Sequence, residues 1–260
     1  MSGPEIAAPE LGSRHIVTRV DGRVLHLRID RTERRNAFTQ DMYRALKRAA
    51  IWADGQPELD AVVLTGTDEW FASGGDMGGN AEDKSGLETE WDPTEHFPFR
   101  HLERCSKLWV AAINGACHAG GLDLVLRCDV AVAADTATFR VPELLRGIPD
   151  TFMSARLVDA VGLARARYLF FTAAEFTADE AVAMGAVGHV VPAADLDDHV
   201  SWVLDRIAQT GPRARSTIKA DINARLGRVE TEVFRQAIRS DEMTEGMRSF
   251  LEKRPPDWPR

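Results

Sequence analysis

Two hydrophobic runs that are each followed by a glycine-rich stretch constrain the fold of this chain most strongly. Residues 61–65 precede Phe71–Met77 (Phe-Ala-Ser-Gly-Gly-Asp-Met), and residues 109–113 precede Asn114–Asp123 (Asn-Gly-Ala-Cys-His-Ala-Gly-Gly-Leu-Asp). A short apolar run bounded by glycine is typical of a strand buried on both faces. Glycine after a strand lets a ligand come close to the main chain. Two N–H groups aimed at one point form an oxyanion hole, so the pattern indicates acyl or enolate chemistry.

The segments around these runs predict an α/β fold. Residues 15–20 and 24–29 flank Asp21-Gly22 and predict a β-hairpin, and Thr39 is placed to cap a following helix. Strand, helix and strand in this order indicate stacked ββα units with parallel pairing. Further strands are expected at 130–134, 138–140 and 187–191, and further helices at 97–105, 120–127, 151–161 and 178–184.

Length and charge bound the organisation and the partners. The 260 residues are enough for one domain with a helical appendage. Because every segment after residue 195 is helical in pattern, we expect a ββα core over residues 1–194 and a helical region over residues 195–260. The net charge of −8 argues against a nucleic-acid partner, which would require a basic face.

The same inspection excludes several other classes of protein. No apolar run is as long as a membrane span, and the N-terminus has no signal-peptide core, so we expect a cytoplasmic protein with no membrane partner. Cys105, Cys117 and Cys128 form no C-x-x-C pair, which favours reduced buried thiols over a metal site or a disulfide. Cys117 would act as a nucleophile only if His118 turned inward as its base.

Five segments, in order, resemble the crotonase superfamily of enoyl-CoA hydratases and isomerases. They are Arg34–Phe38, Phe71–Met77, Asn114–Leu124, Phe139–Glu143 and Glu245–Arg254. The resemblance runs from residue 24 to residue 253. It implies a crotonase-like spiral of ββα units with a C-terminal helical region, assembled as homotrimers or pairs of trimers. It also implies an acyl-CoA thioester substrate and no separate cofactor, because coenzyme A is part of the substrate.

The resemblance assigns roles residue by residue. The N–H groups of Gly75 and Gly120 would form the oxyanion hole, and Asp123 and Glu143 stand where hydratases hold two catalytic glutamates. Residues expected to border coenzyme A or the acyl chain are Arg35, Ala37, Ala72, Gly74, Asp76, Met77, Asp150, Phe152, Phe250 and Lys253. In this family Phe250 and Lys253 often approach the nucleotide from a neighbouring subunit.

Each role has a plainer alternative. Asp123 would be favoured near a helix N-terminus by the dipole alone, and Glu143 could be a solvated residue after a proline. Arg34 and Arg35 could be solvated loop charges, and the glycines could serve turn geometry only. Residues 78–95 are acidic and polar, and we expect them to form a mobile loop over the site.

Several positions depart from the hydratase pattern. Asp123 is one methylene shorter than the usual glutamate, and with Leu124-Val125 it resembles the dienoyl-CoA isomerase branch. That branch carries an aspartate eight residues after its glutamate, whereas here Thr151 takes that place and Asp150 lies one residue earlier. Phe152 and Met153 would shorten the acyl pocket if they point inward.

The leading hypothesis is an enoyl-CoA hydratase or isomerase that stabilises an enolate of its thioester substrate. Asp123 and Glu143 would then move protons, one ionised and one protonated. Two alternatives are a dienoyl-CoA or enoyl-CoA double-bond isomerase and a non-catalytic acyl-CoA-binding protein.

Overall fold

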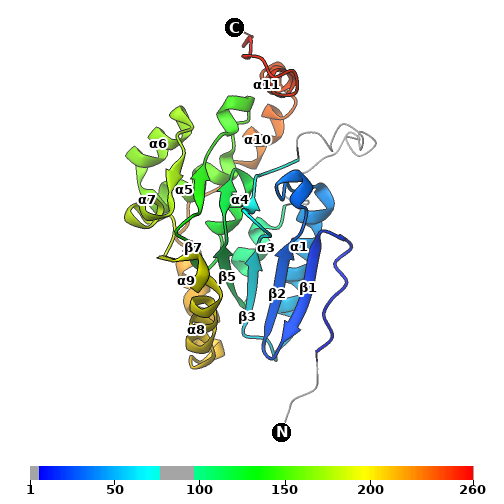
Figure 1. Cartoon of the computed structure of the whole chain (residues 1–260), viewed down its shortest axis with the longest axis vertical. Helices are drawn as coiled ribbons and strands as arrows, with labels where there is room; N and C mark the ends of the chain where they lie inside the picture. The colour runs from blue at the N-terminus through cyan, green and yellow to red at the C-terminus, as the bar shows by residue number, and fades with distance from the viewer. Residues whose placement is uncertain (1–5, 77–96, 260) are drawn as a thin grey trace.

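The computed structural model of the protein describes residues 6–76 and 97–259. It confirms the expected α/β architecture, in which helices surround two sheets and the C-terminal helices α10 (Thr231–Ala237) and α11 (Asp241–Leu251) lie at one end (Figure 1). Two expectations, the substrate contact of Met77 and the loop over residues 78–95, lie outside the described residues.

The larger sheet has six strands in the order β1-β2-β3-β5-β7-β10. They are β1 (Ile16–Asp21), β2 (Val24–Ile29), β3 (Ala61–Thr65), β5 (Leu108–Ile113), β7 (Val130–Ala134) and β10 (His189–Val191). β1 and β2 form the expected antiparallel hairpin, whose turn residue Gly22 has a φ of 54°. Every later neighbour pairs in parallel, as the apolar runs indicate.

A second sheet of four very short strands has the order β4-β6-β8-β9. They are β4 (Trp70–Ala72), β6 (Ala116–His118), β8 (Thr138–Arg140) and β9 (Phe176–Thr177). The sequence predicts only β8, because strands of two or three residues show no periodicity. β4, β6 and β8 pair in parallel, and each follows a strand of the larger sheet. Long strand, short strand and helix therefore repeat along the chain.

The helices follow these strand pairs and then form the C-terminal part of the chain. They are α1 (Gln40–Asp54), α3 (Phe99–Arg104), α4 (Gly120–Val125), α5 (Thr151–Val161), α6 (Leu163–Thr172), α7 (Ala178–Met184), α8 (Leu196–Ala208), α9 (Pro212–Asn223), α10 and α11. Short 3₁₀ turns η1, η4 and η5 cover Thr32–Arg34, Glu143–Arg146 and Ala193–Asp195. Thr39 caps α1 as expected, since its side chain accepts a hydrogen bond from the Met42 N–H.

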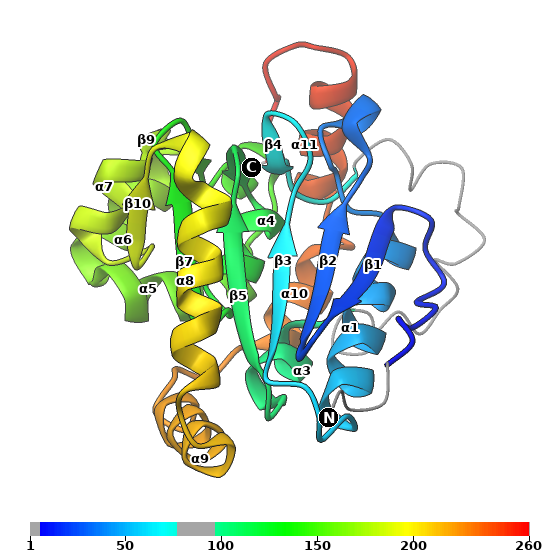
Figure 2. The same ribbon diagram turned by 60° about the horizontal axis from the view of Figure 1, so that its bottom comes forward.

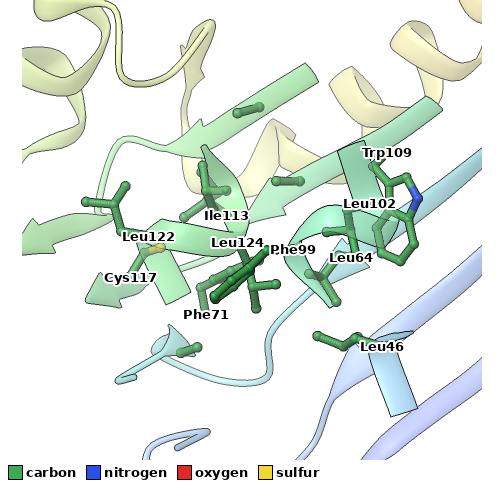
Figure 3. Packing of buried hydrophobic residues seen from close by; sticks show 14 of the residues in the cluster. Leu46, Leu64, Phe71, Phe99, Leu102, Trp109, Ile113, Cys117, Leu122 and Leu124 are labelled. Carbon is green, nitrogen blue, oxygen red and sulfur yellow. The ribbon is translucent and has the colours of Figure 1, made fainter. Parts of the chain in front are cut away.

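Apolar side chains fill both faces of the larger sheet. On one face, side chains from both sheets and from α4 form a single cluster, in which Phe71 and Cys117 of the short strands lie near Ile113 of β5 (Figure 3). On the other face, α8 lies across the sheet (Figure 2) and buries Val200 and Val203 against it. The first helix after residue 195 is thus part of the sheet's packing.

Asparagine side chains hold successive turns of the spiral together. The Asn114 side-chain oxygen accepts a hydrogen bond from the Gly66 N–H at 2.9 Å, and its amide donates to the Asp68 carbonyl at 2.8 Å. Asn36 is fully buried and donates to the Trp70 carbonyl at 2.7 Å. These bonds fix where β4 begins and thus where its carboxyl end lies.

Candidate active site

The segments that could bind or transform a substrate follow three neighbouring strands of the small sheet. The Gly74-Gly75 pair comes after β4, Gly120 after β6 and Glu143 after β8. Because these strands are parallel neighbours, their carboxyl ends meet at one edge. The crevice outside the carboxyl ends of parallel strands is the usual ligand site of an α/β sheet. The structure therefore gathers segments that lie about seventy residues apart in sequence.

Gly75 is held so that its own N–H points away from its neighbours. The Phe38 N–H donates to the Gly74 carbonyl at 2.7 Å, and the Asp76 N–H donates to the Phe38 carbonyl at 2.8 Å. In such a parallel bridge the middle residue directs its N–H to the opposite side. Gly75 is exposed between two buried neighbours, and a methyl group added to it would meet nothing within 4 Å.

The second glycine segment lies directly against the first. A methyl group added at Gly74 would lie 2.5 Å from the Ala119 side chain and 3.5 Å from the Gly120 nitrogen. Ala119 has a φ of 51°, and its N–H donates to the Arg140 carbonyl at 3.0 Å. This turn brings Gly120, the first residue of α4, to the same edge as Gly74 and Gly75.

Asp123 lies one turn into α4 with its carboxyl group buried, and the residue is only 1% exposed. One oxygen, Oδ1, forms an ion pair with Arg127, whereas Oδ2 has no hydrogen-bond partner within residues 6–76 and 97–259. Burial raises the pKa of Asp123 to about 7, although the Arg127 guanidinium acts in the opposite direction. Asp123 therefore keeps one free oxygen on a rigid support.

Arg127 is a buried guanidinium that the sequence analysis did not single out. Besides Asp123, it contacts the Glu103 carboxylate at 3.3 Å and donates to the Phe152 carbonyl at 3.1 Å. Its guanidinium carbon lies 4.3 Å from the centre of the Phe99 ring. Glu103 also accepts a hydrogen bond from Arg156 at 2.6 Å. Asp123 is thus anchored through Arg127 to α3 and α5.

Glu143 is the most isolated carboxyl group of the site. It is 5% exposed, and neither oxygen has a hydrogen-bond partner in the described part of the chain. Burial raises the pKa of Glu143 well above its ordinary value, and the charges of Asp150 and Asp123 raise it further. Burial therefore favours the protonated form of Glu143, which lies close to two other carboxyl groups.

Asp150 lies next to Glu143 and is only half-buried. Its Oδ1 accepts a hydrogen bond from the Met153 N–H at 2.9 Å and so caps α5. Burial raises the pKa of Asp150. Phe152, the second residue of the same helix, packs on three other phenylalanines: the ring centres of Phe97, Phe99 and Phe234 lie 5.4, 5.5 and 5.3 Å away. This aromatic cluster lies beside Arg127.

Tyr43 is the second residue at this edge that the sequence analysis missed. It lies in the first turn of α1, is 6% exposed, and stacks on Phe38 with 4.9 Å between ring centres. Its hydroxyl oxygen occupies the space that any side chain on residue 120 would need. No pattern in the sequence indicates this contact, because α1 and α4 meet only in the folded chain.

The expected coenzyme A contacts form a separate group around the first glycine segment. Ala37 and Ala72 are buried, and Arg35 is exposed with its guanidinium carbon 5.4 Å from the centre of the Trp70 ring. Asp76 is paired with Arg31 at 2.7 Å, and Arg31 also donates to the Ala37 carbonyl at 3.0 Å. The Arg31–Asp76 ion pair therefore joins the first glycine segment to residues 31–37.

The C-terminal residues lie on the outer side of η4. Phe250 is 45% exposed, and its ring centre is 4.1 Å from the Arg146 guanidinium carbon. A hollow of about 370 Å³ is lined in part by Arg146, Phe250, Lys253 and Trp258. A methyl group on Gly246 would overlap the Arg146 carbonyl, so α11 lies directly on the turn that begins with Glu143.

The three cysteines are free thiols, and burial raises the pKa of Cys117 well above its ordinary value. His118 lies 3.4 Å from the Thr138 hydroxyl, and burial lowers the pKa of the imidazole. Among the described residues, no group of three His, Cys, Asp or Glu side chains could hold a metal ion. No helix in that part of the chain is long and apolar enough to cross a bilayer.

Comparisons with known proteins show the family to which the chain belongs. A family model described as enoyl-CoA hydratase/isomerase matches residues 19–260. A crotonyl-CoA hydratase from Syntrophomonas wolfei is 31% identical over 250 residues, which cover 92% of this chain and 96% of that protein. A probable enoyl-CoA hydratase from Mycobacterium tuberculosis is 30% identical over 253 residues, which cover 94% of this chain and 97% of that protein.

A solved structure shares the fold over nearly the whole chain. It is an enoyl-CoA hydratase/isomerase from Pseudoalteromonas atlantica, with a TM-score of 0.82 and 26% sequence identity. The match covers 95% of this chain and 100% of that one.

Proposed function

The chain belongs to the enoyl-CoA hydratase/isomerase family, and on that premise we propose that it adds water to a 2-enoyl-CoA thioester. The observation that carries this proposal is the pair of buried carboxyl groups, Asp123 and Glu143, beside two adjoining glycine turns. Its relatives are named as hydratases of crotonyl-CoA and other enoyl-CoA thioesters. The acyl-CoA thioester supplies the coenzyme, so no separate cofactor is proposed.

The glycine turns would bind the thioester carbonyl. The Gly75 N–H has no partner within the described residues, and Gly120 lies beside Gly74 at the same edge. Together the two N–H groups would stabilise the negative charge that develops on the carbonyl oxygen as water adds to C3. Each donor of this kind contributes about 3–4 kcal/mol to transition-state stabilisation.

The two carboxyl groups would divide the proton transfers. Asp123 is held by Arg127 and is the more readily ionised, so it would accept a proton from the attacking water through its free Oδ2. Glu143 is kept protonated by burial and would deliver a proton to C2 of the enolate. The atoms balance: oxygen bonds to C3, hydrogen bonds to C2, and proton return from Asp123 to Glu143 completes the cycle.

Double-bond isomerisation is the second candidate, and Asp150 is the observation that favours it. Its carboxyl group raises the pKa of Glu143 by its charge, so three carboxyl groups share this edge. An isomerase needs one group to remove a proton and another to return it, without activating water. However, one oxygen of Asp150 already caps α5, which makes it less available than Asp123.

A purely binding role explains the site less well. An unpartnered carboxyl group inside a protein costs stability, and a protein that only holds acyl-CoA gains nothing from two of them. The trimeric or hexameric assembly, with Phe250 and Lys253 reaching a neighbouring nucleotide, remains part of the proposal.

The test is hydration of crotonyl-CoA, followed by the loss of its enone absorbance. We expect turnover by the wild type and a decrease of at least about 100-fold in kcat for both Asp123→Asn and Glu143→Gln. Both changes keep the side-chain shape and remove the ionisable group. Asp159→Asn is a matched control, because Asp159 lies on the far part of α5 and, among the described residues, accepts a hydrogen bond only from the Gly227 N–H.

Binding of butyryl-CoA by the wild type is measured alongside turnover of crotonyl-CoA. Wild-type protein that binds butyryl-CoA but leaves crotonyl-CoA unchanged would contradict the hydratase proposal for this substrate. Unchanged turnover in both carboxyl variants would contradict the assignment of their roles.

A further inference from the structure

Tyr43 places a phenolic hydroxyl group at the edge where the glycine turns meet. The hydroxyl oxygen lies against the α-carbon of Gly120, close enough that an added methyl group there would overlap it. The Tyr43 ring is fixed on two sides, by stacking on Phe38 and by an edge contact with Phe97 at 5.1 Å. The direction of the hydroxyl group is therefore set by packing.

The hydroxyl group is free to donate. In residues 6–76 and 97–259 it has no hydrogen-bond partner, although the residue is only 6% exposed. Burial and the nearby carboxyl groups of Asp123, Asp150 and Glu143 raise the pKa of Tyr43 above its ordinary value. The phenol thus stays protonated at neutral pH.

We propose that the Tyr43 hydroxyl is a further catalytic group, which donates a hydrogen bond to the thioester oxygen beside the Gly120 N–H. This assignment rests on the proposed function, because it requires a CoA thioester in the site. A phenol that points at a bound carbonyl polarises it in the same sense as the backbone donors. The bond strengthens as the oxygen gains negative charge, so it acts mainly on kcat.

A structural role alone would not require the oxygen. The ring contacts with Phe38 and Phe97 are made by carbon atoms, and phenylalanine would keep them. The oxygen in turn prevents any side chain larger than hydrogen at residue 120.

The test measures the bound carbonyl directly. Butyryl-CoA labelled with ¹³C at its carbonyl cannot be hydrated, and its isotope-edited infrared band moves to lower wavenumber as the carbonyl is polarised. We expect a low-wavenumber band in the wild type and a return part of the way towards free butyryl-CoA in Tyr43→Phe. The chain has two tyrosines, so Tyr168→Phe, at an exposed position on α6, is the matched control.

Incorporation of 3-fluorotyrosine into the Tyr168→Phe variant labels Tyr43 alone, because it is then the one tyrosine of the chain. The fluorinated phenol is a stronger donor, so the band should move to still lower wavenumber, in a protein that keeps the hydroxyl group. With crotonyl-CoA, Tyr43→Phe should lower kcat by about 10- to 100-fold and change KM by less than about threefold. A band at the same position in wild type, Tyr43→Phe and fluorinated protein would overturn the assignment.

The two proposals fail in different ways. If the wild type shifts the butyryl-CoA band but hydrates no crotonyl-CoA, hydration is contradicted, and the comparison with Tyr43→Phe still decides the role of Tyr43. If the wild type leaves the band of bound butyryl-CoA where the free thioester has it, the Tyr43 assignment is overturned even if crotonyl-CoA is hydrated.

Discussion

At the scale of single residues, the two acidic groups of the site differ in how they are held. Asp123 has one oxygen paired with Arg127 and one without a partner, whereas both oxygens of Glu143 lack partners among the described residues. The ion pair makes ionisation of Asp123 easier than that of Glu143. Two carboxyl groups in such different surroundings can act as base and acid at the same pH.

The pH dependence of hydration follows from this difference. Burial raises the pKa of Asp123 to about 7, and the reaction needs Asp123 ionised while Glu143 stays protonated. We therefore expect kcat/KM for crotonyl-CoA to fall as the pH drops below about 7. A profile measured between about pH 5.5 and 8.5 that stays flat would contradict the role of Asp123 as base.

The buried carboxyl group of Glu143 should lower the free energy of unfolding of the protein. Replacing Glu143 by methionine removes two buried oxygens that lack partners among the described residues. We therefore expect the free energy of unfolding, measured in urea, to rise by about 1–2 kcal/mol. A carboxyl group with a raised folded-state pKa costs stability once the pH exceeds its unfolded value, so the gain should grow as the pH rises from about 4 to 8. Hydration should be lost at every pH.

The Glu143→Gln variant separates charge from polarity in the same urea experiment. It removes the ionisable proton but keeps two polar atoms without partners, so its gain should be smaller. If Glu143→Met is less stable than the wild type at pH 8, the carboxyl group has stabilising partners that this account omits.

At the scale of elements, α1 and α4 lie so close together that the Tyr43 hydroxyl oxygen leaves no room for a side chain at residue 120. Gly120→Ala should lower the free energy of unfolding by about 1–3 kcal/mol, because the added methyl group overlaps the Tyr43 hydroxyl. In the Tyr43→Phe background the cost should be smaller, since the oxygen is gone. Urea unfolding of the four proteins measures this coupling in a double-mutant cycle.

Gly75→Ala is the matched control for that cycle. Its methyl group would meet nothing within 4 Å, so stability should stay at the wild-type value while hydration decreases, because the methyl group lies where the thioester must approach. Equal costs of Gly120→Ala in both backgrounds would show that the Tyr43 oxygen is not the obstacle.

The elements also show how far the sequence predicts the structure. The hairpin, the helix capped by Thr39 and the strand over residues 61–65 follow from turn residues, capping and apolar runs, and the structure confirms them. The short strands β4, β6 and β9 do not follow, because their pairing partners lie more than twenty residues away and their length gives no period.

The same division holds for the site. The sequence points to Gly75, Gly120, Asp123 and Glu143, and the topology of the small sheet brings their segments to one edge. Arg127 could have been found four residues after Asp123, at the spacing of an ion pair on a helix. Tyr43 could not, because its position depends on how α1 packs against α4.

At the scale of the whole molecule, the ion pairs that hold α9 and the candidate site lie at opposite ends of the larger sheet. Asp60, just before β3, pairs with Arg23 at 2.6 Å and with Arg215 of α9. Lys219 of the same helix pairs with Asp129, just before β7, at 2.8 Å. These contacts attach α9 at the amino ends of the strands, whereas the candidate site lies beyond their carboxyl ends.

Asp60→Asn should therefore weaken the fold and leave the chemistry intact. Burial alone would raise the pKa of Asp60, but hydrogen bonds from Arg23 and Arg215 outweigh it and lower the pKa. The stability that Asp60 contributes is present above pH 4 and is lost as the pH falls below about 4. At pH 7 we expect a loss of about 2–4 kcal/mol in urea unfolding, with kcat for crotonyl-CoA unchanged. A decrease in kcat with no change in stability would contradict this separation.

The proposal that the site adds water across an enoyl-CoA double bond is tested most directly by following solvent atoms into the acyl group. Crotonyl-CoA is incubated with the protein in ¹⁸O-labelled water and, separately, in deuterated water, and the acyl-CoA is analysed by mass spectrometry. We expect a hydroxyacyl-CoA with one solvent oxygen at C3 and one solvent hydrogen at C2. Deuterium without ¹⁸O would indicate double-bond migration, and an acyl group without either label would contradict enolate chemistry on this substrate.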